Sequence, residues 1–206
     1  MIEAKHLRLH RWFFNIYIRY ILQRNFSSIQ IKGSYAERNL PVLLIGNHFS
    51  WWDGFFPYEL NRRLIKKRLY LMMLEEQLAR MKFFRRLGAF SINPGNRSAI
   101  NSINYASGIL DDRDNLLILF PQGRIQSQYM NEIAFRKGWF RILERATGPV
   151  HVVFMVTMTD YLSNKKPGLY IYLEDFPATG NFVLGELETA YSSFYKKCIE
   201  QQKHLE

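Results

Sequence analysis

Six short apolar runs constrain the fold of this chain more than any other feature. They cover residues 42–46, 69–74, 89–92, 115–120, 150–158 and 169–173. Several are continuous rather than alternating, as expected for strands of a sheet that is covered on both faces. Helical patterns lie near 54–66, 75–87, 97–110, 133–146 and 185–203. This alternation predicts an α/β fold with a largely parallel or mixed sheet covered by helices.

The composition fits one domain with a substantial core. The chain has 206 residues, of which 48% are hydrophobic and 16% aromatic, and it contains no repeat or linker-like stretch. Such a composition excludes extended disorder. We therefore expect a single domain over 1–206, with an N-terminal helix region at 1–40, an α/β core at 41–180 and a C-terminal helix at 181–206.

The N-terminal segment predicts an amphipathic helix. Between His6 and Phe26 the polar residues recur at helical spacing. They are Arg8, Arg11, Asn15, Arg19 and Gln23. The segment has no run of the roughly 18 apolar residues that a membrane-spanning helix needs. Its aromatic residues and flanking arginines describe a helix in a membrane interface, whereas its apolar face suits packing on the core. The two interpretations are compatible, because one helix can do both.

The charge balance predicts an anionic partner. Lys and Arg number 28 against 18 Asp and Glu, which gives a net charge of +10. Residues 61–86 are especially basic, although for any single charge a solvated surface is the favoured interpretation. Because these residues adjoin an amphipathic segment and no nucleic-acid motif occurs, we expect an anionic membrane surface as partner and no nucleic acid. Liposome binding and nucleic-acid binding would separate these two classes.

The single cysteine, Cys198, excludes an internal disulfide and indicates a reducing compartment. No histidine lies near Cys198 except in the terminal segment, so a thiol nucleophile is not expected there. His151 lies in an apolar strand, where it should pack or bond within the sheet. Together with the N-terminal helix, these features place the protein at the cytoplasmic face of a membrane, peripherally or interfacially anchored.

One histidine and one aspartate follow the first apolar run closely. His48 and Asp53 lie five residues apart where a buried strand gives way to a helix. A carboxylate on one ring nitrogen leaves the other nitrogen free to act as a base. A structural alternative is equally direct, because Ser50 to Asp53 has the form of a helix-capping motif. No G-x-S-x-G nucleophile elbow occurs, so His48 would activate a substrate hydroxyl directly.

Taken together, five segments resemble the glycerolipid and lysophospholipid acyltransferase superfamily. That family shows N-H-x4-D, a G-x-(I/V)-F-x-x-R block, an F-P-E-G-T-R turn, an F-K-K-G segment and a late V-P-V strand. This chain has Asn47-His48 with Asp53, Gly88-Ala89-Phe90-Ser91-Ile92-Asn93, Phe120-Pro121-Gln122-Gly123-Arg124, Phe135-Arg136-Lys137-Gly138 and Gly148-Pro149-Val150. Their order and spacing match from about residue 41 to 158.

The departures from the family pattern concern the acceptor. Gln122 replaces the usual glutamate, and the following arginine position falls on Ile125, with Arg124 one place early. The arginine of the second block falls on Pro94, with Arg97 three residues later. In the family these positions are associated with the phosphate of the acceptor. The resemblance therefore fixes the reaction type more firmly than the acceptor.

The resemblance implies transfer of an acyl group from acyl-CoA or acyl carrier protein, as cosubstrate, to a hydroxyl of a lysophospholipid or glycerol-phosphate-type lipid. His48 would be the general base and Asp53 its orienting acid. The turn at Gln122, Gly123 and Arg124 would hold the oxyanion. Anionic groups of donor or acceptor would meet Arg97, Arg124, Arg136 and Lys137. No Cys or His spacing typical of a metal site occurs, and no cofactor or metal is expected.

Four aromatic residues beside the proposed base allow two interpretations. They are Trp51, Trp52, Phe55 and Phe56. They can wall an acyl-chain channel or belong to the core. For the function, two alternatives also stay open: the same chemistry on a glycolipid or amino-acid lysolipid, and a noncatalytic peripheral membrane-binding protein with a degenerate site.

Overall fold

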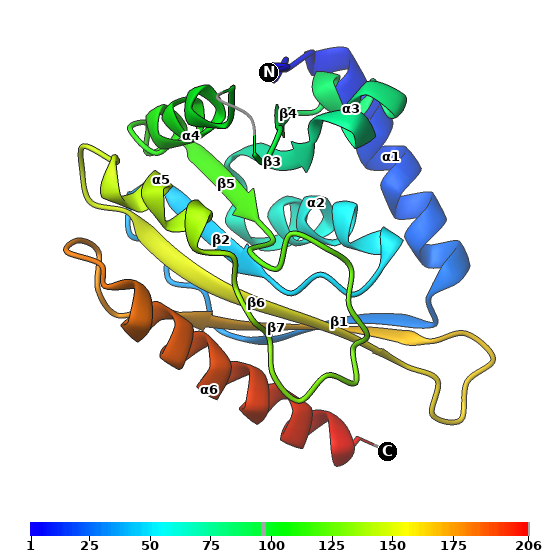
Figure 1. Ribbon diagram of the computed structural model, residues 1–206. Coiled ribbons are helices and arrows are strands. Elements are labelled where there is room, and N and C mark those ends of the chain that lie inside the picture. The colour runs from blue at the N-terminus through cyan, green and yellow to red at the C-terminus, as the bar shows by residue number, and fades with distance from the viewer. Residues whose placement is uncertain (96–97, 206) are drawn as a thin grey trace.

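The structure is a computed structural model that describes residues 1–95 and 98–205 (Figure 1). Its strands are β1 (Ser28–Gly33), β2 (Val42–Gly46), β3 (Arg68–Leu74), β4 (Ala89–Ile92), β5 (Asn115–Leu119), β6 (His151–Asp160) and β7 (Gly168–Asp175). Within the described residues they form a seven-stranded sheet in the order β1-β7-β6-β2-β5-β3-β4. Neighbours pair in parallel except β6 and β7, which are antiparallel. The predicted α/β fold with a mixed sheet is confirmed.

The α-helices are α1 (Arg8–Asn25), α2 (Phe56–Leu60), α3 (Glu75–Arg80), α4 (Ser98–Ile109), α5 (Arg141–Glu144) and α6 (Leu184–Lys203). Shorter helical turns are η1 (Trp51–Gly54), η2 (Asn61–Ile65), η3 (Phe84–Arg86) and η4 (Lys137–Phe140). The long helix expected at 185–203 is α6, and α4 confirms the helix expected at 97–110 over its described part. The N-terminal helix is likewise present as α1.

Three helices expected from the sequence are shorter or broken. The helix expected at 54–66 is three pieces, because Ser50 caps a separate turn and Pro57 occupies the first turn of α2. The helix expected at 75–87 ends at Arg80. The helix expected at 133–146 begins only at Lys137, because the Arg136 N–H donates to the carbonyl of Pro121 and holds the preceding residues as a loop.

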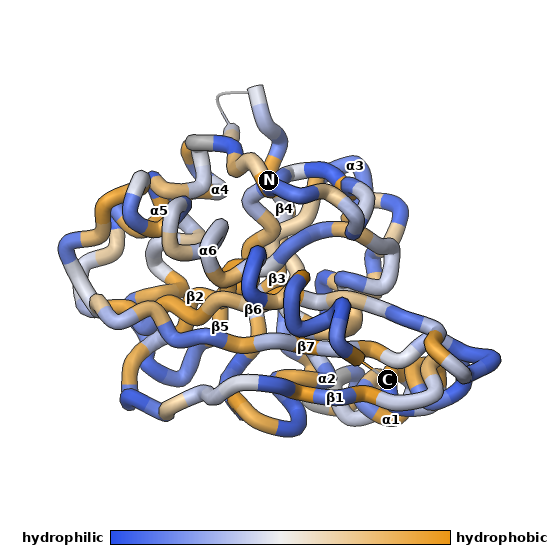
Figure 2. Tube along the Cα trace, turned by 90° about the horizontal axis from the view of Figure 1, so that it is seen from below, coloured by the Kyte–Doolittle hydropathy of each residue, from blue (hydrophilic) through white to orange (hydrophobic). Residues whose placement is uncertain are grey.

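The sheet is buried on both faces. Along β2, Val42 and Leu44 belong to a hydrophobic cluster with α1 and α2. Leu43 and Ile45 belong to the opposite cluster, with α4, α5 and α6. Figure 2 shows the apolar character of the central strands β2, β5 and β6 as an orange band. Continuous apolar runs therefore form this sheet because each of their residues faces a layer of helices.

Helix α1 packs on the core with one face and leaves aromatic side chains on the other. Phe14, Ile18, Leu22 and Phe26 are buried at intervals of four residues. The exposed large side chains are Leu9, Trp12, Phe13, Ile16, Tyr17 and Tyr20. The packing interpretation of the N-terminal segment is thus correct for the inner face. Among the described residues, every helix is too short or too polar to cross a bilayer.

Strand β1 is an element that the apolar pattern did not predict, and it lies inside the expected N-terminal region 1–40. Its residues alternate between exposed and half-buried, as at a sheet edge, and it pairs in parallel with β7. It ends at Gly33, whose φ of +90° suits glycine. A Cβ at this position would lie 2.1 Å from the carbonyl oxygen of Leu173.

Replacement of Gly33 tests this edge. We expect Gly33→Ala to lower the free energy of unfolding by at least about 1 kcal/mol, because the new methyl group meets the backbone of β7 at positive φ. Gly108→Ala is the matched control, since nothing lies within 4 Å of its Cβ position in α4. That variant should be as stable as the wild type or more stable by up to about 1 kcal/mol. Urea denaturation measures both, and an equal effect would contradict the close approach.

Candidate active site

Two loops leave the neighbouring parallel strands β2 and β5 at their C-terminal ends. Ile45 of β2 is paired with Leu119 of β5, and both strands run in the same direction. The segments that begin at Asn47 and Phe120 therefore emerge side by side, at the edge where α/β proteins bind ligands (Figure 1). The sequence placed His48 and the turn at 121–124 at strand ends, and the sheet order brings these two ends together.

The side chain of Asn47 continues the hydrogen bonding of β2 beyond the end of the strand. Its Oδ1 accepts the Thr157 N–H at 2.8 Å, and its Nδ2 donates to the Thr157 carbonyl at 2.9 Å. The amide thus replaces a peptide group opposite β6 while the main chain turns away. Asn47 is 2% exposed, so its two hydrogen bonds are protected from water. Thr157 was not among the expected site residues, because nothing in its sequence context indicates this contact.

His48 is held by Asp53. Its Nδ1 lies 2.7 Å from Oδ2 of Asp53, whose side chain is 1% exposed, whereas the imidazole is 22% exposed. The imidazole also stacks on Phe120, with ring centroids 4.9 Å apart. Among the described residues, Nε2 of His48 has no hydrogen-bond partner. The arrangement fixes one ring nitrogen and leaves the other available to a substrate.

Asp53 is a capping residue as well as the partner of His48. The same Oδ2 atom accepts the N–H groups of Phe49 at 2.7 Å and Ser50 at 2.8 Å. Ser50 and Asp53 form a capping box, and the Ser50 side chain also accepts the Trp52 N–H at 3.2 Å. Burial raises the pKa of Asp53, while the hydrogen bonds from His48, Ser50 and Phe49 oppose that rise. The capping interpretation of this carboxylate is therefore confirmed, and the contact with His48 leaves the catalytic interpretation compatible with it.

Gln122 contacts the backbone of His48. Its Oε1 accepts the His48 N–H at 2.5 Å, and its Nε2 donates to Oε1 of Gln126 at 2.6 Å. The Gln126 N–H in turn donates to the His48 carbonyl at 2.9 Å. Gln126 was missed by the sequence analysis, because a glutamine in a loop carries no distinctive signal.

Gly123 lies in a hydrogen-bonded turn at the end of β5. Its N–H donates to the carbonyl of Phe120 at 3.0 Å, so this donor of the expected oxyanion turn is engaged within the protein. The residue also makes room for Arg136. Its φ is +64°, and a Cβ here would lie 2.8 Å from Cδ of Arg136. Glycine therefore lets the Arg136 side chain lie against the turn.

Two of the four cations expected to bind anionic groups have described side chains, and both follow β5. Arg124 and Arg136 are exposed, and neither forms an ion pair within the described part of the chain. Arg97 lies outside the described residues, as does the side chain of Lys137. Arg124 and Arg136 are thus exposed to an anion, and Arg124 directly follows Gly123 in the turn after β5.

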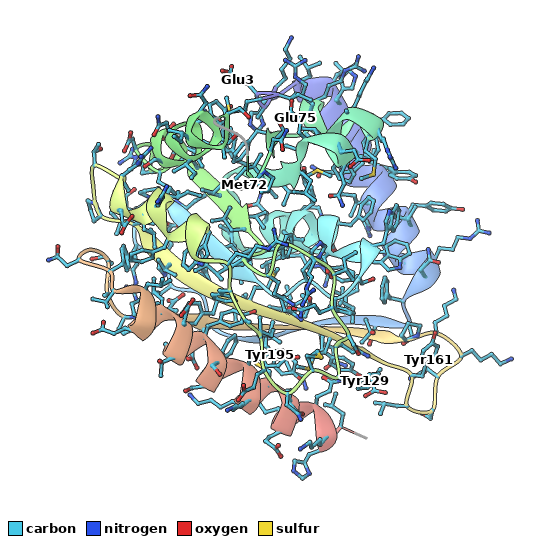
Figure 3. The ribbon with its side chains drawn as sticks, in the orientation of Figure 1. Glu3, Met72, Glu75, Tyr129, Tyr161 and Tyr195 are labelled. Carbon is cyan, nitrogen blue, oxygen red and sulfur yellow. The ribbon has the colours of Figure 1, made fainter. Side chains whose placement is uncertain are left out.

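The loop at 124–136 is fastened at its middle. Gln128 exchanges hydrogen bonds with Thr159 at the end of β6. The hydroxyl of Tyr195, on α6, donates to the carbonyls of Gln128 and Met130. Figure 3 shows Tyr195 beside the loop that carries Tyr129. The segment that holds the His48 backbone is therefore anchored to two other elements.

Comparison with protein-family models shows the family of this chain. A family model described as Acyltransferase matches residues 28–172, which is most of the chain. The chain belongs to the acyltransferase family. Among solved structures it resembles the 1-acyl-sn-glycerophosphate (LPA) acyltransferase PlsC from Thermotoga maritima, with a TM-score of 0.64 and 17% identity over 95% of this chain and 82% of that one. A search of curated proteins finds no match.

In this acyltransferase, the aromatic residues after His48 differ in exposure. Phe55 is 2% exposed and Phe56 is fully buried, and they pack with Phe14, Phe26 and other core rings. Their packing fits the core alternative. Trp51 is 58% exposed at the start of η1, the turn that contains Asp53. Trp51 and the half-buried Trp52 thus remain the candidates for contact with an acyl chain.

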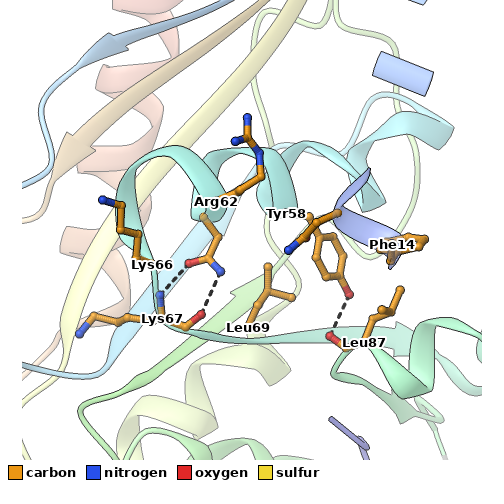
Figure 4. A pocket seen from close by; sticks show the side chains of 9 residues that line it. Phe14, Tyr58, Arg62, Lys66, Lys67, Leu69 and Leu87 are labelled. Atoms are coloured by element: carbon orange, nitrogen blue, oxygen red, sulfur yellow. Dashed lines mark hydrogen bonds between the residues drawn. The ribbon is translucent and has the colours of Figure 1, made fainter. Parts of the chain in front are cut away.

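The first part of the basic segment 61–86 lies away from His48. A hollow of about 220 Å³ is lined by Arg62, Lys66 and Lys67, just before β3 begins (Figure 4). Arg62 and Arg63 pair with the buried Glu59, and Lys67 lies 3.2 Å from Glu37. Strands β2, β5 and β3 are parallel, so this hollow lies at their N-terminal ends, whereas His48 lies at the C-terminal end of β2. Much of the charge seen in the sequence is therefore used in local ion pairs.

A second His–Asp pair lies at the N-terminal end of β6, at the other end of the parallel strands from His48. His151 begins β6, is fully buried, and has Nε2 3.1 Å from Oδ1 of Asp175. Its ring stacks on Tyr35, and burial lowers the pKa of His151. This is the packing within the sheet that the sequence predicted. Burial raises the pKa of the Cys198 thiol to about 12, which makes it a poor nucleophile.

Asp53→Asn tests the pairing. We expect kcat to fall by roughly 10²–10⁴-fold, because His48 loses the charge that stabilises its protonated form. Stability should not fall at neutral pH. Burial raises the pKa of Asp53, so ionisation of this carboxyl destabilises the native state. The penalty is absent when the pH is below the pKa that Asp53 has in the unfolded chain. It is complete when the pH is above the pKa that Asp53 has in the folded chain.

Thermal melts across pH measure the second effect. The melting temperature of Asp53→Asn relative to wild type should rise as pH increases through that window. Asp175→Asn, which alters the other His–Asp pair, is the matched control and should retain kcat. A large loss of kcat in both variants would show a general structural effect instead.

Proposed function

We propose that this acyltransferase moves a fatty acyl group from acyl-CoA or acyl carrier protein to a hydroxyl of a lysophospholipid or glycerol-phosphate-type lipid. The observation that carries the proposal is the His48–Asp53 pair, with Nδ1 held at 2.7 Å and Nε2 unengaged among the described residues. Such a pair at a strand end is suited to removing a proton from a hydroxyl.

The proposed reaction uses His48 twice. Nε2 takes the proton of the acceptor hydroxyl while the oxygen attacks the thioester carbonyl, and Asp53 stabilises the imidazolium. The tetrahedral intermediate then collapses, the carbon–sulfur bond breaks, and the thiolate receives the proton from His48. With the Gly123 N–H engaged, we assign the oxyanion to the N–H of Arg124, another donor of the predicted turn.

The exposed arginines after β5 support an acceptor that carries a phosphate group. Arg124 and Arg136 can bind a phosphate group, and guanidinium groups do so with two parallel hydrogen bonds. PlsC, the structural relative, is named for a 1-acyl-sn-glycerophosphate acceptor. The shifted arginine positions of this chain motivate a second candidate, a glycolipid or amino-acid lysolipid with the same reactive hydroxyl.

Release of free thiol tests the chemistry. Purified protein with acyl-CoA or acyl carrier protein and a panel of acceptors should release thiol, and His48→Ala should lower turnover by roughly 10²–10⁴-fold. His204→Ala, which removes a histidine at the far end of α6, is the control and should retain wild-type turnover. Unchanged turnover in His48→Ala would exclude this residue as the base.

The donor and acceptor panels decide the finer points. Turnover with one donor alone identifies the cosubstrate, and mass spectrometry of the product identifies the acceptor. If the wild type binds vesicles but transfers no acyl group with any pair, the noncatalytic alternative is favoured.

We also propose that the outer face of α1 lies in the surface of an anionic membrane, on the cytoplasmic side. Trp12 and Phe13 are 65% and 71% exposed. An apolar groove of about 800 Å³ runs along the helix, lined by these residues with Leu9, Tyr17 and Phe83. Arg19 and Arg24 flank the apolar face. Exposed aromatic residues next to basic ones are typical of interfacial helices.

Sedimentation with vesicles of phosphatidylglycerol and phosphatidylcholine tests this surface. Replacing both Trp12 and Phe13 with Ser should weaken binding by at least about tenfold, because two large apolar side chains no longer leave water. Ile100→Ser is the matched control, since Ile100 is 47% exposed on α4. High salt should weaken the wild-type interaction. Equal binding by all three proteins would contradict the assignment of this face.

A further inference from the structure

We propose that Gln122 and Gln126 are positioning residues that clamp the peptide backbone of His48, and that the Gln122 side chain does not bind the acceptor. The inference rests on the proposed function for its kinetic test. Gln122 replaces the family's usual glutamate. In this proposal its side chain contacts the backbone of the base and not the substrate.

The contacts form a closed ring. The His48 N–H donates to Oε1 of Gln122, and the His48 carbonyl accepts the N–H of Gln126. Nε2 of Gln122 donates to Oε1 of Gln126 and joins the two. Both polar groups of the His48 main chain are therefore satisfied by one loop. Gln122 is 5% exposed and already uses both ends of its amide.

The position of His48 explains why a clamp is needed. The pairing of β2 with β6 ends at Gly46, and the Asn47 side chain makes the last contact with β6. From His48 onward the main chain has left the sheet, so no strand fixes its peptide. Asp53 orients the imidazole, whereas the glutamine ring fixes the backbone that carries it. A base displaced by about 1 Å loses on the order of 10²-fold in rate.

The hydrogen-bond roles give a sharp prediction about charge. A carboxylate at 122 still accepts the His48 N–H, and the Gln126 amide can turn to donate to it. A carboxylate at 126 still accepts from Gln122. Carboxylates at both positions would face each other at the contact that is now 2.6 Å, with no proton between them at neutral pH. Each single change should therefore be tolerated and the double change should not.

Steady-state kinetics test the clamp. Gln122→Leu should lower kcat by about 10²-fold with little change in KM for the acceptor, because the base moves and the binding groups do not. Gln122→Glu and Gln126→Glu should each keep a kcat near that of wild type, and the double Glu variant should lose it. Lowering the pH should raise the kcat of the double variant relative to that of the wild type at the same pH, since one shared proton removes the repulsion.

Gln128→Leu is the control from the same loop. It removes the contacts with Thr159 but none with His48, so it should lower the melting temperature while keeping kcat. A rise in acceptor KM at unchanged kcat in Gln122→Leu would overturn the proposal, because it would place Gln122 at the substrate. Additive effects of the two Glu changes would also overturn it.

A measurement without turnover separates this inference from the proposed function. Amide hydrogen exchange at His48 should be slow in the wild type and in Gln122→Glu, and much faster in Gln122→Leu. The same exchange rate in all three would contradict the clamp even if the protein transfers acyl groups. Protection that follows this order would support it even if no acyl transfer were found.

Discussion

One carboxylate oxygen holds the turn on which the site depends. Oδ2 of Asp53 accepts hydrogen bonds from the main chain of Phe49 and Ser50 and from the imidazole of His48. The first two contacts shape the turn that leaves β2, and the third orients the imidazole of His48 within that turn. Because the group is almost fully buried, its charge is costly unless all of these donors are in place. Local folding and the chemistry that we propose for His48 are thus coupled through one atom.

The fold was largely readable from the chain because its central strands are buried on both faces. Continuous apolar runs such as 42–46 and 115–119 have no other stable location, and they appear as β2 and β5. Strand β1 was not predicted, because an edge strand with partly exposed residues has no continuous apolar run. The helix expected at 133–146 was overestimated for a tertiary reason, since the contact between Arg136 and Pro121 holds its first residues against the end of β5.

The site was readable only in part. His48 and Asp53 are five residues apart, so their contact is local and their spacing predicts it. The contacts of Asn47 with Thr157 and of His48 with Gln122 join residues 110 and 74 positions apart, and no local pattern specifies them. The exposure of Trp51 and the burial of Phe55, only four residues later, also depend on the packing of α1 and could not be read from their aromatic character.

The double duty of Asp53 has a consequence for descendants of this chain. If such a lineage abandoned its chemistry, drift would be free to replace the imidazole, which only the reaction needs. A side chain with an acceptor oxygen, aspartate or asparagine, would persist, because the bend in the main chain would still require it. Such a residue that survives at this place without its histidine would therefore mark a chain that has lost its activity, and its presence alone would be poor proof of catalysis.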